Sequence, residues 1–454
     1  MLKRIVNVRE GETRPLLWSF AYFFCLLCSY YILRPVRDEM GIQGGVKNLQ
    51  WAFTGTFVAM LAAVPMFGAV AARLPRHKLL PLVYYFFILN LLGFFALFKS
   101  GIATASVAWA FFIWVSVFNL FVVSVFWSLM ADLFTNEQAR RLFGFIAAGG
   151  SAGALLGPTL AASLAIALGP VNLLLISALF LILAVVCIHR LVRRLPEYEH
   201  AARSREERAP PEEGQAREAH SQEVSIGGGI LTGVKLVFQS PYLLGICLYI
   251  WLYTTLSTFL YFEQAHIVVD TFAESKRRTA LFASIDLVVN ALTVLGQVFL
   301  TGRIVARFGV PVTLALVPAA MVLGFLTLGL FPVLPVLVAF QVLQRAGNHA
   351  ISRPAREILF TVVGREEKYT SKNFIDTVVY RGGDAVSGWL FAGLAGMGLG
   401  RSGIAFAAVP VAAAWLITGL GLGKKQEAWR CDPWRIRATC QVPFGRSRSR
   451  AGAP

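Results

Sequence analysis

Residues 68–73 read Gly-Ala-Val-Ala-Ala-Arg and residues 302–307 read Gly-Arg-Ile-Val-Ala-Arg, so a G-x-x-x-A-R pattern occurs twice, 234 residues apart. A second pair of matching stretches, Arg-Leu-Phe at 141–143 and Lys-Asn-Phe at 372–374, is 231 residues apart. Each of the latter leads into a glycine-rich segment. Two features that repeat at nearly the same offset indicate a chain built from two copies of one unit.

Long apolar stretches surround both copies of the pattern. The 454 residues are 56% hydrophobic and only 15% charged, whereas soluble domains average about 25% charged residues. This composition excludes an ordinary soluble enzyme, a disordered chain and a disulfide scaffold. A membrane-spanning helix needs about 20 mostly apolar residues. The sequence predicts twelve spans, over residues 15–33, 49–72, 79–98, 105–131, 142–168, 171–189, 241–263, 279–301, 311–331, 333–351, 373–398 and 402–422.

A polar segment separates the first six spans from the last six. It carries many Arg and Glu residues together with Pro and Gly, which is typical of a linker. We therefore expect an all-α polytopic membrane protein whose twelve transmembrane helices form two pseudo-symmetric six-helix bundles. The expected parts are an N-terminal bundle (1–190), a cytoplasmic linker (191–240), a C-terminal bundle (241–422) and a basic, disordered cytoplasmic tail (423–454).

The net charge of +17 is distributed unevenly between the two sides of the predicted membrane. Segments on the side of the N-terminus hold 32 of the 42 Lys and Arg residues, and the opposite side holds 8. Positive residues collect in cytoplasmic loops. This bias places both termini and the linker in the cytoplasm, and we expect a multi-pass protein of a bacterial inner membrane. The charge is thereby explained without nucleic acid, which we do not expect as a partner.

The repeated G-x-x-x-A-R pattern resembles the loop signature of the major facilitator superfamily. In that family an acidic residue usually precedes the basic one, and Ala72 and Ala306 take its place here. The resemblance implies the major facilitator fold, with two bundles that rock around a central cavity. It further implies gating loops, which contain Gly68, Arg73, Gly302 and Arg307.

Several charged residues fall inside or at the ends of predicted spans, where a charge costs about 2.5–3.5 kcal/mol on insertion scales. Arg34 and Arg37 either reach the membrane interface or form a cation site, since a guanidinium suits phosphate or carboxylate. Asp286 is either a proton carrier or a structural partner of a neighbouring helix. Arg381 and Asp384 are three residues apart and can neutralise each other, although we favour a functional role for Asp384.

Three stretches resemble a narrower family, the bacterial and plastid ATP/ADP translocases. They are Tyr-Ile-Leu-Arg-Pro-Val-Arg-Asp at 31–38, Phe-Trp-Ser-Leu-Met-Ala-Asp at 126–132, and 352–381. The resemblance implies exchange of ATP for ADP. It implies substrate-binding roles for Arg37, Asp132, Glu263 and Lys372. Asp384 departs from the family, because a Lys is expected there.

These observations predict a secondary transporter rather than an enzyme. We expect it to move a nucleotide, by ATP/ADP exchange, or a related organic anion by alternating access. The alternative is a proton-coupled symporter or exporter of another small molecule, with Asp286 or Asp384 as the coupling group. We expect no cofactor and no metal, a small anionic solute and the lipid bilayer as partners, and a monomer. The candidate substrate-binding residues are Arg34, Arg37, Asp132, Glu263, Lys372 and Arg381.

Overall fold

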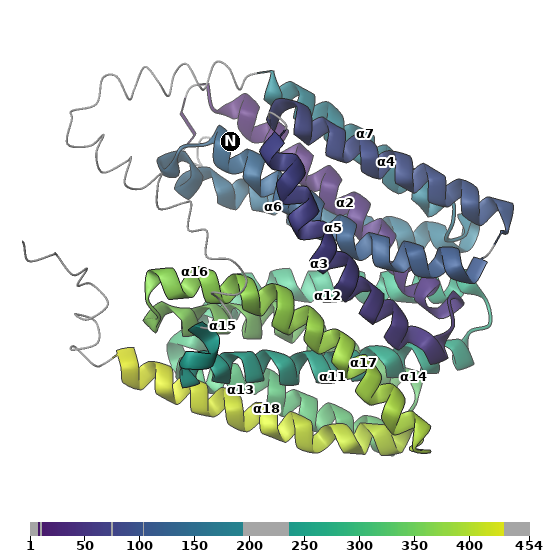
Figure 1. Ribbon diagram of the computed structural model, residues 1–454, viewed down its shortest axis with the longest axis vertical. Coiled ribbons are helices and arrows are strands. Elements are labelled where there is room, and N and C mark those ends of the chain that lie inside the picture. The colour runs from purple at the N-terminus through teal and green to yellow at the C-terminus, as the bar shows by residue number, and fades with distance from the viewer. Residues whose placement is uncertain (1–7, 10, 74–75, 103, 194–235, 431–454) are drawn as a thin grey trace, which may run out of the picture.

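The computed structural model describes residues 8–430, except for residues 10, 74–75, 103 and 194–235. Every regular element in this part of the chain is a helix, and Figure 1 shows that the helices lie in two groups, α2–α7 and α11–α18. Among the described residues, ten helices are long and apolar enough to span a membrane. The predicted all-α membrane fold is confirmed.

The first group contains six long helices, which correspond to the first six predicted spans. They are α2 (Thr13–Gln43), α3 (Leu49–Arg73), α4 (Arg76–Ser100), α5 (Thr104–Leu133), α6 (Asn136–Leu168) and α7 (Leu173–Val192).

The second group begins after the linker, and its tenth and eleventh spans are each divided by a π turn. The continuous helices are α11 (Pro241–Thr271), α12 (Ser275–Phe299), α13 (Thr301–Leu330) and α18 (Arg401–Arg430). The divided spans are α14 (Leu334–Gly347), η2 (Asn348–Ser352) and α15 (Arg353–Leu359), then α16 (Arg365–Phe374), η4 (Ile375–Val379) and α17 (Tyr380–Gly396).

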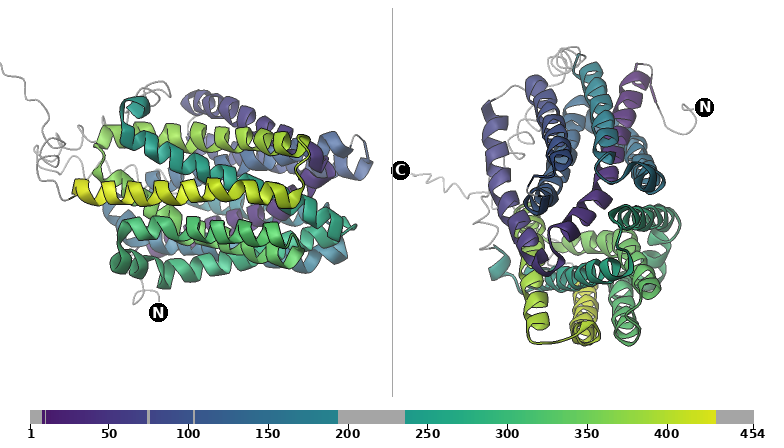
Figure 2. Two further views of the ribbon diagram at one scale, coloured as in Figure 1. Left: turned by 90° about the horizontal axis from the view of Figure 1, so that it is seen from below. Right: turned by 90° about the vertical axis from the view of Figure 1, so that its right-hand side faces the viewer.

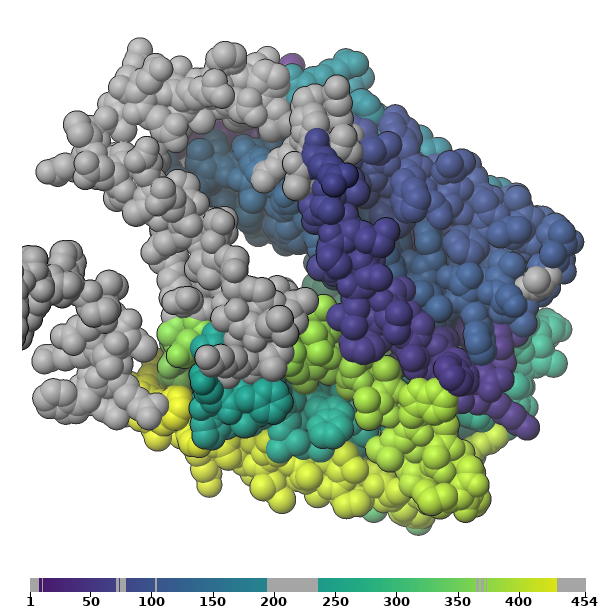
Figure 3. All heavy atoms as spheres, viewed as in Figure 1, coloured from purple at the N-terminus to yellow at the C-terminus, as the bar shows by residue number. Residues whose placement is uncertain are grey.

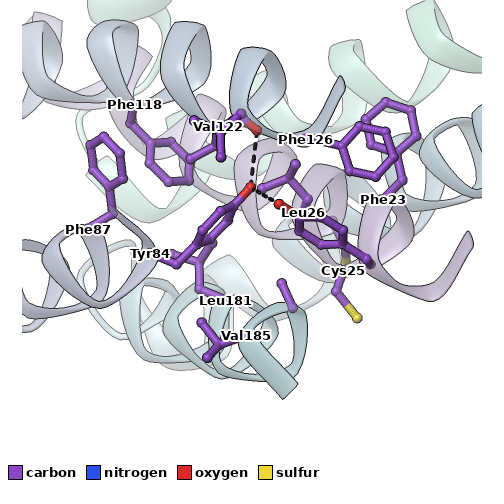
Figure 4. Packing of buried hydrophobic residues seen from close by; sticks show 14 of the residues in the cluster. Phe23, Cys25, Leu26, Tyr84, Phe87, Phe118, Val122, Phe126, Leu181 and Val185 are labelled. Carbon is purple, nitrogen blue, oxygen red and sulfur yellow. Dashed lines mark hydrogen bonds between the residues drawn. The ribbon is translucent and has the colours of Figure 1, made fainter. Parts of the chain in front are cut away.

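Each half has its own apolar core. In the N-terminal half, the Tyr22 hydroxyl donates to the Tyr84 hydroxyl at 2.5 Å, and Tyr84 donates to the Val122 carbonyl at 3.1 Å (Figure 4). A buried hydroxyl without a partner is costly, so this chain of hydrogen bonds permits polar groups among Phe and Leu side chains. It joins α2, α4 and α5.

Close approach of two backbones fixes α2 against α6. A Cβ atom built on Gly153 would lie 2.3 Å from the Phe24 carbonyl oxygen, and one on Gly157 would lie 2.7 Å from the Cys28 carbonyl oxygen. No side chain fits at these distances. The glycine-rich segment that follows Arg-Leu-Phe in the sequence therefore serves helix packing.

Several predicted boundaries differ from those observed. Helix α2 continues ten residues past the predicted end at Leu33, with Pro35 inside it, and thereby carries Arg34 and Arg37 within a buried helix. Gly68 and Arg73 also lie in a helix, since α3 ends at Arg73. Helix α18 continues to Arg430, so the beginning of the predicted disordered tail is helical. Residues 194–235 of the predicted linker, and 431–454 of the tail, lie outside the described residues.

Gly302 and Arg307 also belong to a helix, the first part of α13, rather than to a loop. The break in the chain comes at Gly309, where φ is 74°. Glycine adopts this left-handed conformation readily. A carboxylate oxygen of Glu427 accepts a hydrogen bond from the Val310 N–H at 3.2 Å. The second part of α13 then crosses the bundle.

The two halves are in contact at one end of the molecule and separated at the other. We call the end where α2 stops at Gln43 the far end, and the end where α7 stops at Val192 the linker end. At the far end Gln43 Nε2 donates to Ser275 Oγ at 3.0 Å, and the Trp389 indole donates to Thr54 at 3.0 Å. Figure 2 shows the helices of both halves running side by side, and Figure 3 shows open space between α6 and α16 at the linker end.

Candidate functional site

A cavity of about 590 Å³ lies between the two halves. Volumes of about 300–1,000 Å³ are usual for small-molecule sites. Helices of both halves contribute side chains to its walls: α2, α3 and α5 from one half, and α11, α14, α15 and α17 from the other. Five arginines line it together with two aspartates: Arg34, Arg37, Arg345, Arg353, Arg381, Asp38 and Asp384.

Helix α2 supplies one wall because its cavity residues recur every three or four positions. Leu27, Tyr31, Arg34 and Asp38 all line the cavity, and such positions share one helix face. The remaining faces of α2 are buried against α5, α6 and α7. The burial of α2 by neighbouring helices thus directs its charged stripe toward the cavity.

One carboxylate bridges arginines from both halves. Asp286 of α12 is 1% exposed and forms an ion pair with Arg345 of α14. Its second oxygen is 3.7 Å from Arg34 Nε of α2, which is an ion pair but too long for a hydrogen bond. Two guanidinium groups therefore share one carboxylate, which leaves a single positive charge. Arg34 has the weaker attachment.

A third guanidinium reaches the same region because of the π turn η2. In a straight α-helix, residues eight positions apart are offset by about 80° around the axis. The longer π turn lowers the rotation per residue and brings Arg353 back toward the face of Arg345. His349, between them, lies within electrostatic reach of both and of Arg34. Among the described residues no carboxylate lies within ion-pair distance of Arg353, whose electrostatic neighbours include Tyr253 and Tyr380.

The other charges of the cavity form a cluster with no net charge. Arg37 is 3.1 Å from Asp38, and Arg381 is 3.6 Å from Asp384. The Tyr261 hydroxyl donates to Asp38 at 3.0 Å. This arrangement agrees with the neutralisation considered for Arg381 and Asp384. The net charge of the site therefore resides on the arginines around Asp286.

The far end of the cavity is closed by a buried ion pair between the halves. Arg278 of α12 donates from Nε and Nη2 to the two carboxylate oxygens of Glu39 of α2, at 2.8 and 2.7 Å. Arg278 Nη1 also donates to the carbonyls of Phe272 and Ala273, at 2.9 and 2.8 Å. Glu39 is 0% exposed. Separation of the halves at this end requires this pair to break.

The structure brings some of the predicted site residues together and leaves others apart. Arg34, Arg37, Arg381 and Asp384 line the cavity, and Asp286 stands directly behind it. Three residues implied by the translocase resemblance are absent from its lining. Asp132 lies near the end of α5, Glu263 is buried in the C-terminal half, and Lys372 is bonded to Glu357 at 2.6 Å.

Five charged residues that matter to this geometry are missing from the sequence-based prediction of the site, and one of them, Arg345, falls inside the predicted span 333–351. The predicted spans leave Arg353 in a cytoplasmic segment. Its spacing of four positions from His349 signals a shared helix face, but no pattern in the sequence indicates the π turn that brings it toward Arg345. Glu39 and Arg278 fall beyond the predicted span ends, and no pattern in either segment indicates that they meet. Asp38 stands out in the sequence only as part of a family motif.

The comparisons with known proteins agree with this architecture. The model of the Major Facilitator Superfamily matches residues 16–352. Among solved structures, a mutant of the nucleoside transporter NupG is 12% identical with a TM-score of 0.62, over 91% of this chain and 99% of that one. A bacterial homologue of the iron transporter ferroportin in an inward-facing state is 13% identical with a TM-score of 0.62, over 92% and 98%.

A POT family transporter in complex with 5-aminolevulinic acid is 13% identical with a TM-score of 0.61, over 91% of this chain and 96% of that one. No curated protein matches the sequence. Identities this low show the fold and leave the solute open. The family match covers most of the chain, includes both copies of the repeated pattern, and agrees with the two bundles and the cavity between them. The chain belongs to the Major Facilitator Superfamily of secondary transporters.

Proposed function

We propose that the solute of this transporter is an organic anion. The observation that carries the proposal is the charge of the cavity wall, with five arginines against two aspartates. Asp286 lowers the net positive charge of the cavity by one further unit, since it pairs with Arg34 and Arg345. Guanidinium groups bind phosphate and carboxylate through charge-assisted hydrogen bonds, and a cavity with excess positive charge favours an anion over a neutral or cationic solute.

The same geometry supports alternating access around the cavity. The buried pair of Glu39 and Arg278 closes the far end, whereas the halves are apart at the linker end. A solute that enters from the linker end reaches Arg34, which belongs to one half, and Arg345, which belongs to the other. Binding between the halves changes the contacts that hold them in one orientation, which is how a ligand shifts a two-state equilibrium.

Exchange of ATP for ADP is the more specific form of this proposal. Of the four residues that the translocase resemblance implies, Arg37 alone lines the cavity. The geometry of the site therefore gives ATP/ADP exchange little support, and measurement of nucleotide transport must decide it. We propose a cytoplasmic location for both termini on the same footing, because the distribution of Lys and Arg supports it.

Counterflow in proteoliposomes tests the proposal. Vesicles loaded with one unlabelled anion are tested for uptake of its labelled form, with ATP, ADP, AMP and small organic phosphates and carboxylates. We expect uptake for at least one anion. The Arg34→Gln variant should reduce it by about 10- to 100-fold, the value of a charged hydrogen bond.

Arg356→Gln is the matched control, because Arg356 lies on α15 outside the cavity lining and pairs with Asp376 at 3.3 Å. Uptake should persist in it. Counterflow of neutral or cationic solutes, with none for any anion, would refute the proposal.

Proton coupling is a second candidate, favoured by the position of Asp384 in the cavity wall. Thr258 lies 3.5 Å from this carboxylate, and Arg381 lies 3.6 Å from it. A carboxylate in a solute cavity can alternate between a proton and a guanidinium partner. If it does so here, Asp384→Asn removes the stimulation of uptake by a pH gradient and leaves counterflow without a gradient. Retention of that stimulation in the variant rules out Asp384 as the coupling group.

A further inference from the structure

The charges of the cavity divide into two groups of different net charge. Arg37, Asp38, Arg381 and Asp384 sum to zero. We call the other group, Arg34, Arg345 and Arg353 with Asp286, the cationic seam. Three guanidinium groups against one carboxylate leave a net charge of +2.

The cationic seam is a built site rather than a group of surface arginines. Asp286 and Arg345 are 1% and 8% exposed. Arg345 Nε and Asp286 Oδ2 are buried atoms without a hydrogen-bond partner. Buried polar atoms of this kind usually find a partner. Arg345 lines the cavity, so its Nε is a donor that an acceptor oxygen of a bound anion can satisfy, whereas Asp286 Oδ2 faces Arg34 Nε at 3.7 Å.

An apolar wall contributed by the N-terminal half belongs to the same cavity. Phe23 and Leu27 of α2, with Leu120 and Val123 of α5, line it. Arg345 and Arg353 come from the C-terminal half. One half therefore offers apolar contact, and the other offers most of the positive charge.

We propose that the cationic seam binds the dianionic head of an organic phosphomonoester, with the organic body against the apolar wall. This inference rests on the proposed anion transport and narrows it. A phosphomonoester carries a charge of about −1.5 to −2 at pH 7 and three acceptor oxygens, which match a net charge of +2 and three guanidinium groups from two halves. Asp286 is a positioning residue. Its carboxylate orients the guanidinium groups of Arg34 and Arg345 toward the same point, where the bound phosphate pairs with them. A nucleoside triphosphate carries more negative charge than the site compensates, so this inference favours a monophosphate over the exchange of ATP for ADP.

Direct binding to the purified full-length chain in lipid nanodiscs tests the charge assignment. The probes are phenyl phosphate, phenyl sulfate of the same shape but single charge, and ATP. At pH 7.5 we expect phenyl phosphate to bind at least about 10-fold more tightly than phenyl sulfate, the value of one charged hydrogen bond, and no more weakly than ATP. Its affinity should fall below about pH 6, where the phosphate gains a proton.

Arg353→Gln should lower the affinity for phenyl phosphate by about 10- to 100-fold and leave the affinity for phenyl sulfate nearly unchanged, so that the discrimination between them is lost. Arg356→Gln, one helical turn further along α15, should change neither. Asp286→Asn provides an independent measurement, since it raises the charge of the seam to +3. The affinity for ATP relative to that for phenyl phosphate should then increase.

Equal affinity for phenyl phosphate and phenyl sulfate overturns the inference, as does unchanged discrimination in Arg353→Gln. Tighter binding of ATP that depends on Arg353 also overturns the dianion assignment, but it leaves the proposed anion transport intact. Absence of binding and counterflow for every anion refutes both the proposed anion transport and the assignment of the cationic seam to a phosphomonoester. The two failures are therefore distinguishable.

Discussion

The buried ion pair between Glu39 and Arg278 should stabilise the orientation in which the far end is closed, so loss of the Glu39 charge should shift the protein toward an open far end. In the Glu39→Gln variant, the side chain keeps its length but loses its charge. Removal of one partner of a buried ion pair costs about 3–5 kcal/mol. We expect a cost at the lower limit of this range, since Arg278 keeps its hydrogen bonds to the carbonyls of Phe272 and Ala273. About 3 kcal/mol corresponds to a ~150-fold change in the equilibrium between closed and open far ends.

The measurement is a distance distribution between spin labels at residues 102 and 397, in a background without the native cysteines. Ile102 and Met397 are 67% and 71% exposed, and they lie at the far end of different halves. We expect a longer-distance population to appear or grow in Glu39→Gln. Arg278→Lys, which keeps the charge but loses the two-pronged contact, should give a smaller population.

Glu137→Gln is the matched control, because Glu137 forms an exposed ion pair with Arg9 within one half, at 2.6 Å. It should leave the distances unchanged. Identical distributions in the folded Glu39→Gln variant and the unchanged protein would refute the reasoning that this pair holds the far end closed.

Three further predictions concern stability and the resemblance. Gly153→Ala places a Cβ 2.3 Å from the Phe24 carbonyl oxygen and should destabilise the protein by about 1–3 kcal/mol, seen as a lower Tm, whereas Gly144→Ala on the same helix meets nothing within 4 Å and should not; equal Tm values contradict this packing. Hydrogen bonds from Arg141, Arg9 and Gln138 outweigh the burial of Glu12 and lower the pKa of its carboxyl. Glu12→Gln should therefore cost about 1–2 kcal/mol at pH 7, and the Tm difference should shrink as pH falls below the usual glutamate value of about 4.3, because the carboxylate is then lost from the unaltered protein too; a difference independent of pH would contradict it. Lys372→Gln removes a partly exposed pair with Glu357, so we expect about 0–1 kcal/mol of stability loss and at least about half of the counterflow; loss of nucleotide exchange in this variant would instead support the role implied by the translocases.

The sequence predicts the helices well because a membrane imposes a length and a composition on every span. It also identifies Arg34, Arg37, Arg381 and Asp384, since a charge inside an apolar stretch stands out by its cost. The repeat indicates two halves, and a cavity between them follows from the family resemblance. None of these inferences requires knowledge of which side chains are in contact.

The partners of the charges depend on tertiary contacts that local composition does not encode. Glu39 and Arg278 are 239 residues apart, and each looks like an ordinary charge near a membrane surface. Composition misplaces Arg353 because charged residues become frequent after Ser352, which ends the predicted span although the helix continues to Leu359. Motif resemblance transfers residue types but not their surroundings, so Asp132 and Lys372 fall outside the cavity lining.

One hydrogen bond near the middle of the molecule has a mechanical consequence. Asn290 Nδ2 of α12 donates to the Ala154 carbonyl of α6 at 2.8 Å, beside the tight glycine packing of α6 on α2. If the halves tilt about this contact, Arg278 lies about 18 Å from the fulcrum along α12, and Asp286 about 6 Å. Each ~3° of tilt then moves Arg278 by about 1 Å but Asp286 by only a third of that. The same rotation that separates the far end leaves the arginines around Asp286 almost in place, so the solute keeps its contacts while the route to it changes sides.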